Sequence, residues 1–178
     1  VHEFDLTNFD LERKYRHSYR VMKLIEQLAR SLKLSEEDVT LACIIGILHD
    51  IGRFEQLKET DSYDDSKFEH ADFGVHYLKK SHFLEQCHVP DAWHSIIFTA
   101  IQLHNKYQIP EHLDEKTLLF TKLIRDADKI DILRLALEKN HESTGEIRKQ
   151  VIDEFYQKKQ IHILPDFSKK KFVLVRLG

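Results

Sequence analysis

The sequence has few of the residues that build turns, crosslinks and membrane spans. Five glycines and three prolines among 178 residues argue against a turn-rich β fold and favour helices. The two cysteines, Cys43 and Cys87, lie far apart and form no C-x-x-C pair, which predicts reduced thiols in a cytoplasmic protein. The longest apolar run, Leu41–Leu48, is far shorter than the roughly 20 residues of a membrane-spanning helix.

The sequence also lacks an excess of charge of either sign. It carries 27 basic and 30 acidic residues, a net charge of −3, which predicts no nucleic-acid partner. Val1–Asp10 has neither the basic nor the apolar region of a secretion signal, so we expect no secretion. The shortness of the apolar runs predicts no membrane partner. The length predicts one domain over 1–178, with a core over about 10–160 and a tail over 161–178.

Apolar residues at helical spacing are plentiful and predict an all-α bundle of about six helices. Ser35, Ser66 and Asp114 are the expected helix-capping residues. The tail contains two short β-prone runs, Ile161–Leu164 and Phe172–Leu177, which predict a small hairpin. The expected helices cover 10–33, 36–49 or 50, 66–80, 90–105, 114–139 and 143–158.

The stretch Leu41–Glu55 joins an apolar helix to a polar pair. Leu41–Leu48 is apolar or small, and His49 and Asp50 follow directly. Burying an ionised carboxylate costs several kcal/mol unless it is paired or bound to a metal. This sequence therefore predicts that His49 and Asp50 bind a metal ion.

Two further candidate ligands lie on apolar helix faces. His17 is one turn before Val21, and Asp128 is one turn after Ile124. A lone histidine in such a place is more often a core residue bonded to a carbonyl. Asp126 and Asp131 compete with Asp128. Asp126 shares a face with lysines and is expected in solvent, whereas Asp131 has Arg134 as a partner. A site of imidazoles and carboxylates suits Fe, Mn, Co, Ni or Zn.

His70 and His104 follow the same logic. Each has apolar or aromatic residues on its helix face, and Gly74, one turn after His70, permits close approach of another helix. Taken singly, each is as easily a core histidine as a ligand. Taken together, they would complete a second metal site that shares Asp50.

The order His17, His49-Asp50, Asp128 resembles the HD-domain metal-dependent phosphohydrolase superfamily. The motif HDIGR after an apolar helix and ADK late in the chain are typical of it, and the resemblance spans roughly 15–135. His70 in FEHADFG and His104 in QLHNK are similar to the extra ligands of the six-ligand branch. The resemblance implies a hydrolase that acts on a small phosphorylated metabolite, with a nucleotide as the first candidate. It also implies two divalent metal ions. Whether the protein forms a homodimer is left open.

The resemblance implies that two metals would hold a bridging hydroxide, which would attack phosphorus. His17, His49, Asp50 and Asp128 hold the first metal, and Asp50, His70 and His104 the second, with Asp50 catalytic as the bridge. Arg53, one turn after Asp50, is the expected catalytic residue for the substrate phosphate, and a surface salt bridge is its alternative. Lys129 is a weaker phosphate candidate, since solvated lysines are common.

Three other functions compete with the hydrolase. Some HD-type proteins with six ligands are mixed-valent di-iron oxygenases, and the ligands alone do not separate the two classes. A module that senses nucleotides without turnover is a third reading. An all-α scaffold whose histidines are ordinary core residues is the fourth.

Overall fold

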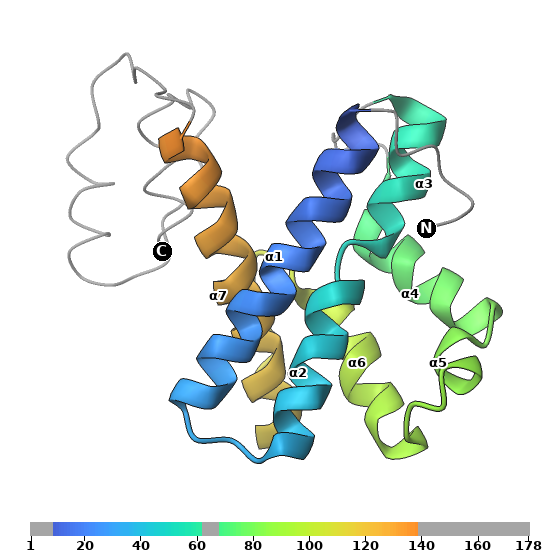
Figure 1. The fold of residues 1–178 in the computed structure, drawn as a ribbon. Coiled ribbons are helices and arrows are strands. Elements are labelled where there is room, and N and C mark those ends of the chain that lie inside the picture. Colours follow the sequence, from blue (N-terminus) through green and yellow to red (C-terminus); the bar gives the residue numbers. More distant parts are fainter. Residues whose placement is uncertain (1–8, 62–67, 139–178) are drawn as a thin grey trace. The chain divides into compact units, whose positions relative to one another are not determined.

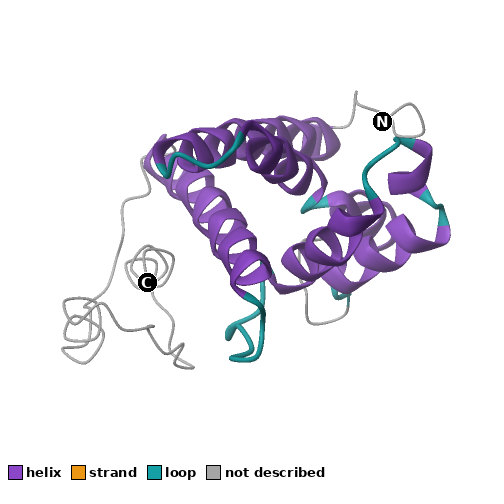
Figure 2. Cartoon of the chain, turned by 90° about the horizontal axis from the view of Figure 1, so that it is seen from below, coloured by secondary structure: helices purple, strands orange, loops and turns teal. Residues whose placement is uncertain are grey.

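The structure, a computed structural model, describes residues 9–61 and 68–138. Within these ranges every regular element is a helix and none is a strand, as the colours of Figure 2 show. The predicted all-α fold is therefore confirmed. The helices are α1 (Phe9–Ser31), α2 (Glu36–Leu48), α3 (Ile51–Thr60), α4 (His70–Lys80), the single turn α5 (Phe83–Gln86), α6 (Asp91–Leu103) and α7 (Glu115–Glu138).

The chain divides into two compact units, residues 1–127 and 128–178, and α7 runs from the first into the second. The single domain over 1–178 stays a prediction. The helix expected over 143–158 and the hairpin expected in the tail lie outside the described residues. Of the described helices, none has the length and apolar character to cross a membrane.

Two helices begin at the predicted capping residues. The Ser35 side chain accepts a hydrogen bond from the Asp38 backbone N–H over 3.1 Å at the start of α2. Asp114 Oδ1 accepts one from the Thr117 N–H over 2.9 Å at the start of α7. These bonds satisfy amide groups that have no partner inside the helix, and those from Thr117 lower the pKa of the Asp114 carboxyl.

The segment around α3 and α4 departs from the prediction. Helix α3 was not expected, and it buries Phe54, Gln56 and Leu57. Helix α4 begins at His70, later than a cap at Ser66 implies. Glu69, the expected partner of Ser66 in that cap, instead points its carboxylate at Lys106 Nζ, 2.6 Å away. Ser66, the expected cap itself, lies outside the described residues.

The core of the first unit packs α1, α2, α4, α6 and the first part of α7 together. Fully buried side chains from four of these helices include Ile25, Ile45, Ile97 and Ile124. Figure 1 shows α1 beside α2, and these two helices meet along their length. The apolar run of α2 is thus surrounded by other helices, and its end delivers His49 and Asp50 into the interior.

Candidate metal centre

The chain changes direction at His49–Asp50. Helix α2 ends at Leu48 and α3 begins at Ile51, and Asp50 between them has φ −104° and ψ 17°. Both side chains are buried, with His49 1% and Asp50 3% exposed. A break between two helices thus places an imidazole and a carboxylate in the core, where packing alone gives them no reason to be.

Three more histidines reach the same place from other helices. His17 comes from α1, His70 is the first residue of α4, and His104 directly follows α6. All three are buried. Five of the six predicted ligands therefore gather within the first unit.

The two oxygens of Asp50 face different pairs of histidines. Oδ2 lies 3.5 Å from His17 Nε2 and 3.6 Å from His49 Nε2. Oδ1 lies 3.3 Å from His70 Nε2 and 3.6 Å from His104 Nε2. We name these the first pair (His17, His49) and the second pair (His70, His104). The carboxylate stands between them, with one oxygen for each.

The backbone fixes how two of the imidazoles can bind a metal. His49 Nδ1 lies 2.8 Å from Gly46 O, and His104 Nδ1 lies 2.6 Å from Ile101 O. A carbonyl only accepts, so each Nδ1 carries the proton and donates it. Each Nε2 then presents a lone pair toward Asp50, as a metal ligand must.

The electrostatics around Asp50 favour its ionised carboxylate and a neutral His104. Burial by itself would raise the pKa of Asp50, but the Lys14 ammonium and the surrounding imidazoles outweigh it and hold the pKa well below its usual range. Burial lowers the pKa of His104, and the attraction of Asp50 only partly opposes it. Asp50 is therefore anionic at neutral pH, and His104 is neutral.

The spacing of these donor atoms fits divalent ions. Nitrogen and oxygen ligands lie about 2.1 Å from a zinc ion. Two such ligands at ordinary coordination angles are about 3.0–3.5 Å apart. The distances from Asp50 to the histidines fall in or just beyond this range, and the two Nε2 atoms of the second pair are 3.2 Å apart. His49, Asp50 and His104, which include one histidine from each pair, also form a group that could hold a single metal.

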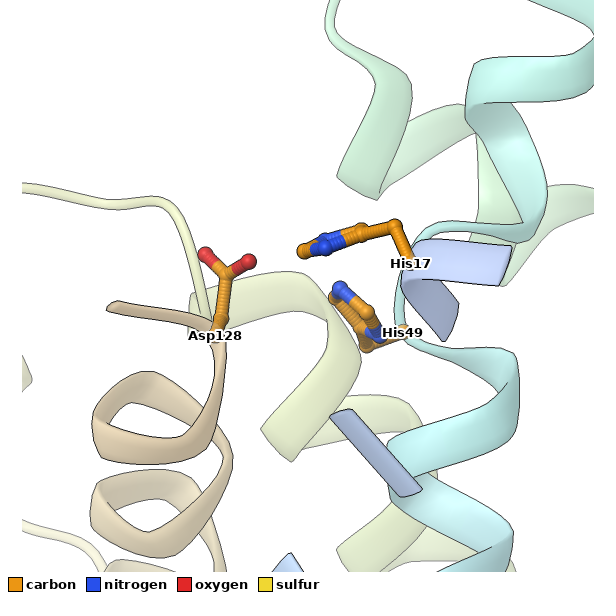
Figure 3. Close-up of side chains that lie close together, drawn as sticks. All are labelled: His17, His49 and Asp128. Carbon is orange, nitrogen blue, oxygen red and sulfur yellow. The ribbon is translucent and has the colours of Figure 1, made fainter. Parts of the chain in front are cut away.

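Asp128 is the sixth predicted ligand and the first residue of the second unit. Figure 3 draws it on α7 together with His17 and His49, whose imidazoles lie next to each other with ring centroids 5.3 Å apart. The rival carboxylates behave as predicted. Asp126 is exposed, and Arg134 Nε donates to Asp131 Oδ1 over 3.1 Å. The role of Asp128 in a metal site stays a prediction.

Arg53 lies beside Asp50, on the side of the second pair. Its Nε is 3.7 Å from Asp50 Oδ1, and its Nη1 donates to Gln56 Oε1 over 2.6 Å. This places a guanidinium beside the proposed bridge. Lys129, the other predicted phosphate ligand, belongs to α7 in the second unit, and its role stays a prediction.

Lys14 is a site residue that the sequence analysis missed. It lies one turn before His17 on α1, and its Nζ donates to Asp50 Oδ2 over 2.7 Å. The i, i+3 spacing from His17 was a usable signal, because residues three apart share a helix face. A lysine in a charged run such as ERKYR is, however, usually solvated.

Contacts farther from Asp50 hold the second pair in place. Arg125 on α7 donates to the carbonyl oxygens of Leu103, His104 and Lys106, so it caps the end of α6 where His104 sits. Lys106 Nζ contacts Glu69 Oε2 at 2.6 Å, and Glu69 directly precedes His70 in the chain. The segments that carry His70 and His104 are thereby tied together.

A close approach between α3 and α4 also sets the position of His70. A side chain at Gly52 would overlap the carbonyl oxygen of His70 and come within 2.9 Å of Gly74 N. Gly74 in turn lies against Ile51 and Gly52, so the close approach predicted at Gly74 is confirmed.

Comparison with known proteins yields one match. The family model described as the HD domain matches residues 15–133, a range that includes all six predicted ligands. No curated protein and no solved structure matches the chain.

Proposed function

The chain belongs to the HD-domain family, and from this premise we propose that it is a metal-dependent phosphohydrolase acting on a small phosphorylated metabolite, with a nucleotide as the first candidate. HD domains bind divalent metals and are generally phosphohydrolases. The proposal adds two metal ions per chain, a shared carboxylate and the substrate class.

The observation that carries the proposal is the position of Asp50. Its two oxygens face two different pairs of Nε2 atoms at 3.3–3.6 Å. A buried histidine in an ordinary core needs one partner, and four of them around one carboxylate exceed what packing requires. This geometry favours a centre with two cations over the scaffold reading.

The chain's own groups define the reaction that we propose. Two divalent ions in such a centre lower the pKa of water and neutralise charge on phosphoryl oxygens. Asp50 and the two histidine pairs would hold the ions, and Asp128 would be a further ligand of the ion at the first pair. The anionic Asp50 and the lone pair of the neutral His104 stand ready to bind at neutral pH.

Arg53 is proposed to bind the substrate phosphate. Its Nε stands 3.7 Å from Asp50 Oδ1, and its side chain is 13% exposed, so it borders both the centre and solvent. A planar guanidinium can hold two oxygens of one phosphate group. Lys129 is kept as a second, weaker phosphate ligand.

The test is a phosphate-release screen over nucleotides, dinucleoside polyphosphates and sugar phosphates with Mn²⁺, Fe²⁺, Co²⁺ or Ni²⁺ added. We expect turnover of at least one nucleotide, abolished by chelation and reduced at least about 1,000-fold in Asp50→Asn, since losing the metals removes several kcal/mol of transition-state stabilisation. Asp38→Asn is the matched control, because Asp38 also pairs with a lysine, 2.8 Å from Lys116 Nζ.

Other outcomes of the same work distinguish the competing functions. Oxygen consumption with an EPR signal from a half-oxidised di-iron cluster would replace the hydrolase with the oxygenase. Tight nucleotide binding by metal-loaded protein without turnover would favour the sensor. Metal-loaded protein that neither binds nor hydrolyses any of these phosphates contradicts the proposed substrate class.

A further inference from the structure

Lys14 places a positive charge directly on the candidate metal centre. Its Nζ is 2.7 Å from Asp50 Oδ2, and its side chain is only 18% exposed against 4% for Asp50. An ion pair this short and this sheltered is a charge-assisted hydrogen bond. It joins α1 to the break between α2 and α3.

The oxygen that Lys14 contacts is the one that faces the first pair. Oδ2 also stands 3.5 Å from His17 Nε2 and 3.6 Å from His49 Nε2. An ion held by the first pair and Asp50 would therefore bind the same oxygen as the ammonium. Two cations on one buried oxygen repel each other strongly where water screens poorly.

The cation on the side of the second pair, Arg53, lies farther from Asp50 than Lys14 does. Arg53 Nε lies 3.7 Å from Oδ1, and the Arg53 guanidinium also donates to Gln56 Oε1. The two halves of the centre are thus unequal. A cation already sits on the oxygen of the first pair.

We propose that Lys14 is a place-holding cation, which neutralises Asp50 before a metal binds and which the ion entering between His17 and His49 must displace. The inference rests on the proposed metal centre and adds to it a residue that sets metal affinity. Lys14 acts through Asp50, so it is a positioning residue.

The energetics of burial explain why the protein would need such a residue. Asp50 is buried, and a buried carboxylate without a counter-charge destabilises the fold. Lys14 Nζ, 2.7 Å from Oδ2 and largely sheltered from solvent, supplies that counter-charge. The ammonium therefore stabilises the metal-free protein and, for the same reason, weakens metal binding at the first pair.

The test measures Mn²⁺ binding to the chelated full chain by EPR of the free ion, in wild type, Lys14→Met and Lys14→Gln. Losing a charged hydrogen bond that competes with the metal should tighten one class of site about ten- to hundredfold. The metal-free variants should melt at a lower temperature than wild type, and Mn²⁺ should raise their melting temperature by more. Lys116→Met removes a more exposed ion pair with Asp38. It should leave the Mn²⁺ affinity unchanged at both positions of the centre.

The outcomes separate this inference from the proposed function. Unchanged or weaker Mn²⁺ binding in both Lys14 variants, beside a wild type that binds Mn²⁺, overturns the place-holding role alone. A wild type that binds none of the metals overturns both. Lys14→Gln keeps a polar side chain of moderate size and serves if Lys14→Met does not fold. One folded variant is sufficient for the measurement.

Discussion

At the scale of single residues, the geometry of Asp50 accounts for most of the site. One carboxylate faces two pairs of imidazoles, and backbone carbonyls fix the tautomers of His49 and His104. The histidines were predictable because each lies on, or directly follows, an apolar stretch of helix. Lys14 was not predicted, although it shares a helix face with His17, because a lysine in a charged run is usually solvated and this one instead donates to Asp50.

A substitution of one histidine should separate the two halves of the centre. His104→Ala removes one histidine of the second pair and none of the first pair. We therefore expect loss of about one bound ion per chain, while the ion at the first pair stays bound. Metal analysis after gel filtration measures this. His94→Ala is the control, since His94 is a half-buried histidine whose Nε2 lies 3.0 Å from Val89 O.

The result that opposes this expectation is equal loss of both ions from His104→Ala. That result would mean one coupled site in place of two positions joined by Asp50. A circular dichroism spectrum of the chelated variant checks that the helices remain.

At the scale of elements, the site depends on how closely helices approach. The α3–α4 contact at Gly52 leaves no room for a side chain, because a Cβ there would overlap the His70 carbonyl. Because His70 is the first residue of α4, this contact sets its position. Arg125 provides a comparable constraint at the end of α6.

Gly52→Ala should therefore damage both stability and metal binding. Overpacking of this kind costs about 1–3 kcal/mol, a fall in melting temperature of about 2–4 °C for each kcal/mol in a chain of this size. Displacement of His70 should also weaken binding at the second pair. Lys80→Ala, at an exposed position of the same α4, should leave both unchanged.

Thermal melts with and without Mn²⁺ test the two effects separately. A Gly52→Ala protein as stable as wild type would show that α3 and α4 can separate freely. In that case the close contact would not be what positions His70.

At the scale of the molecule, the sequence predicted the helical fold well because apolar spacing and capping residues report local structure. It also distinguished the four buried candidate histidines, His17, His49, His70 and His104, from other histidines: His76, His82, His88 and His112 are exposed, and His94 is half-buried. It missed α3, which packs closely against α4 at Gly52, and it expected the next helix to begin earlier than α4 does. Such contacts between distant segments leave no periodic pattern in the chain.

The division of α7 between two compact units bears on the sixth ligand. Asp128 was predicted from its helix face, next to the buried Ala127. Its contribution, like that of Lys129, is a matter for direct measurement.

The central claim is that Asp50 joins two metal ions, and the number of ions bound per chain tests it most directly. Chelated wild type and Asp50→Asn are equilibrated with Mn²⁺, passed over a desalting column and analysed for metal and protein together. We predict about two ions per chain for wild type and close to none for Asp50→Asn, because an amide supplies no negative charge to either position. Wild-type metal content in Asp50→Asn would contradict the account.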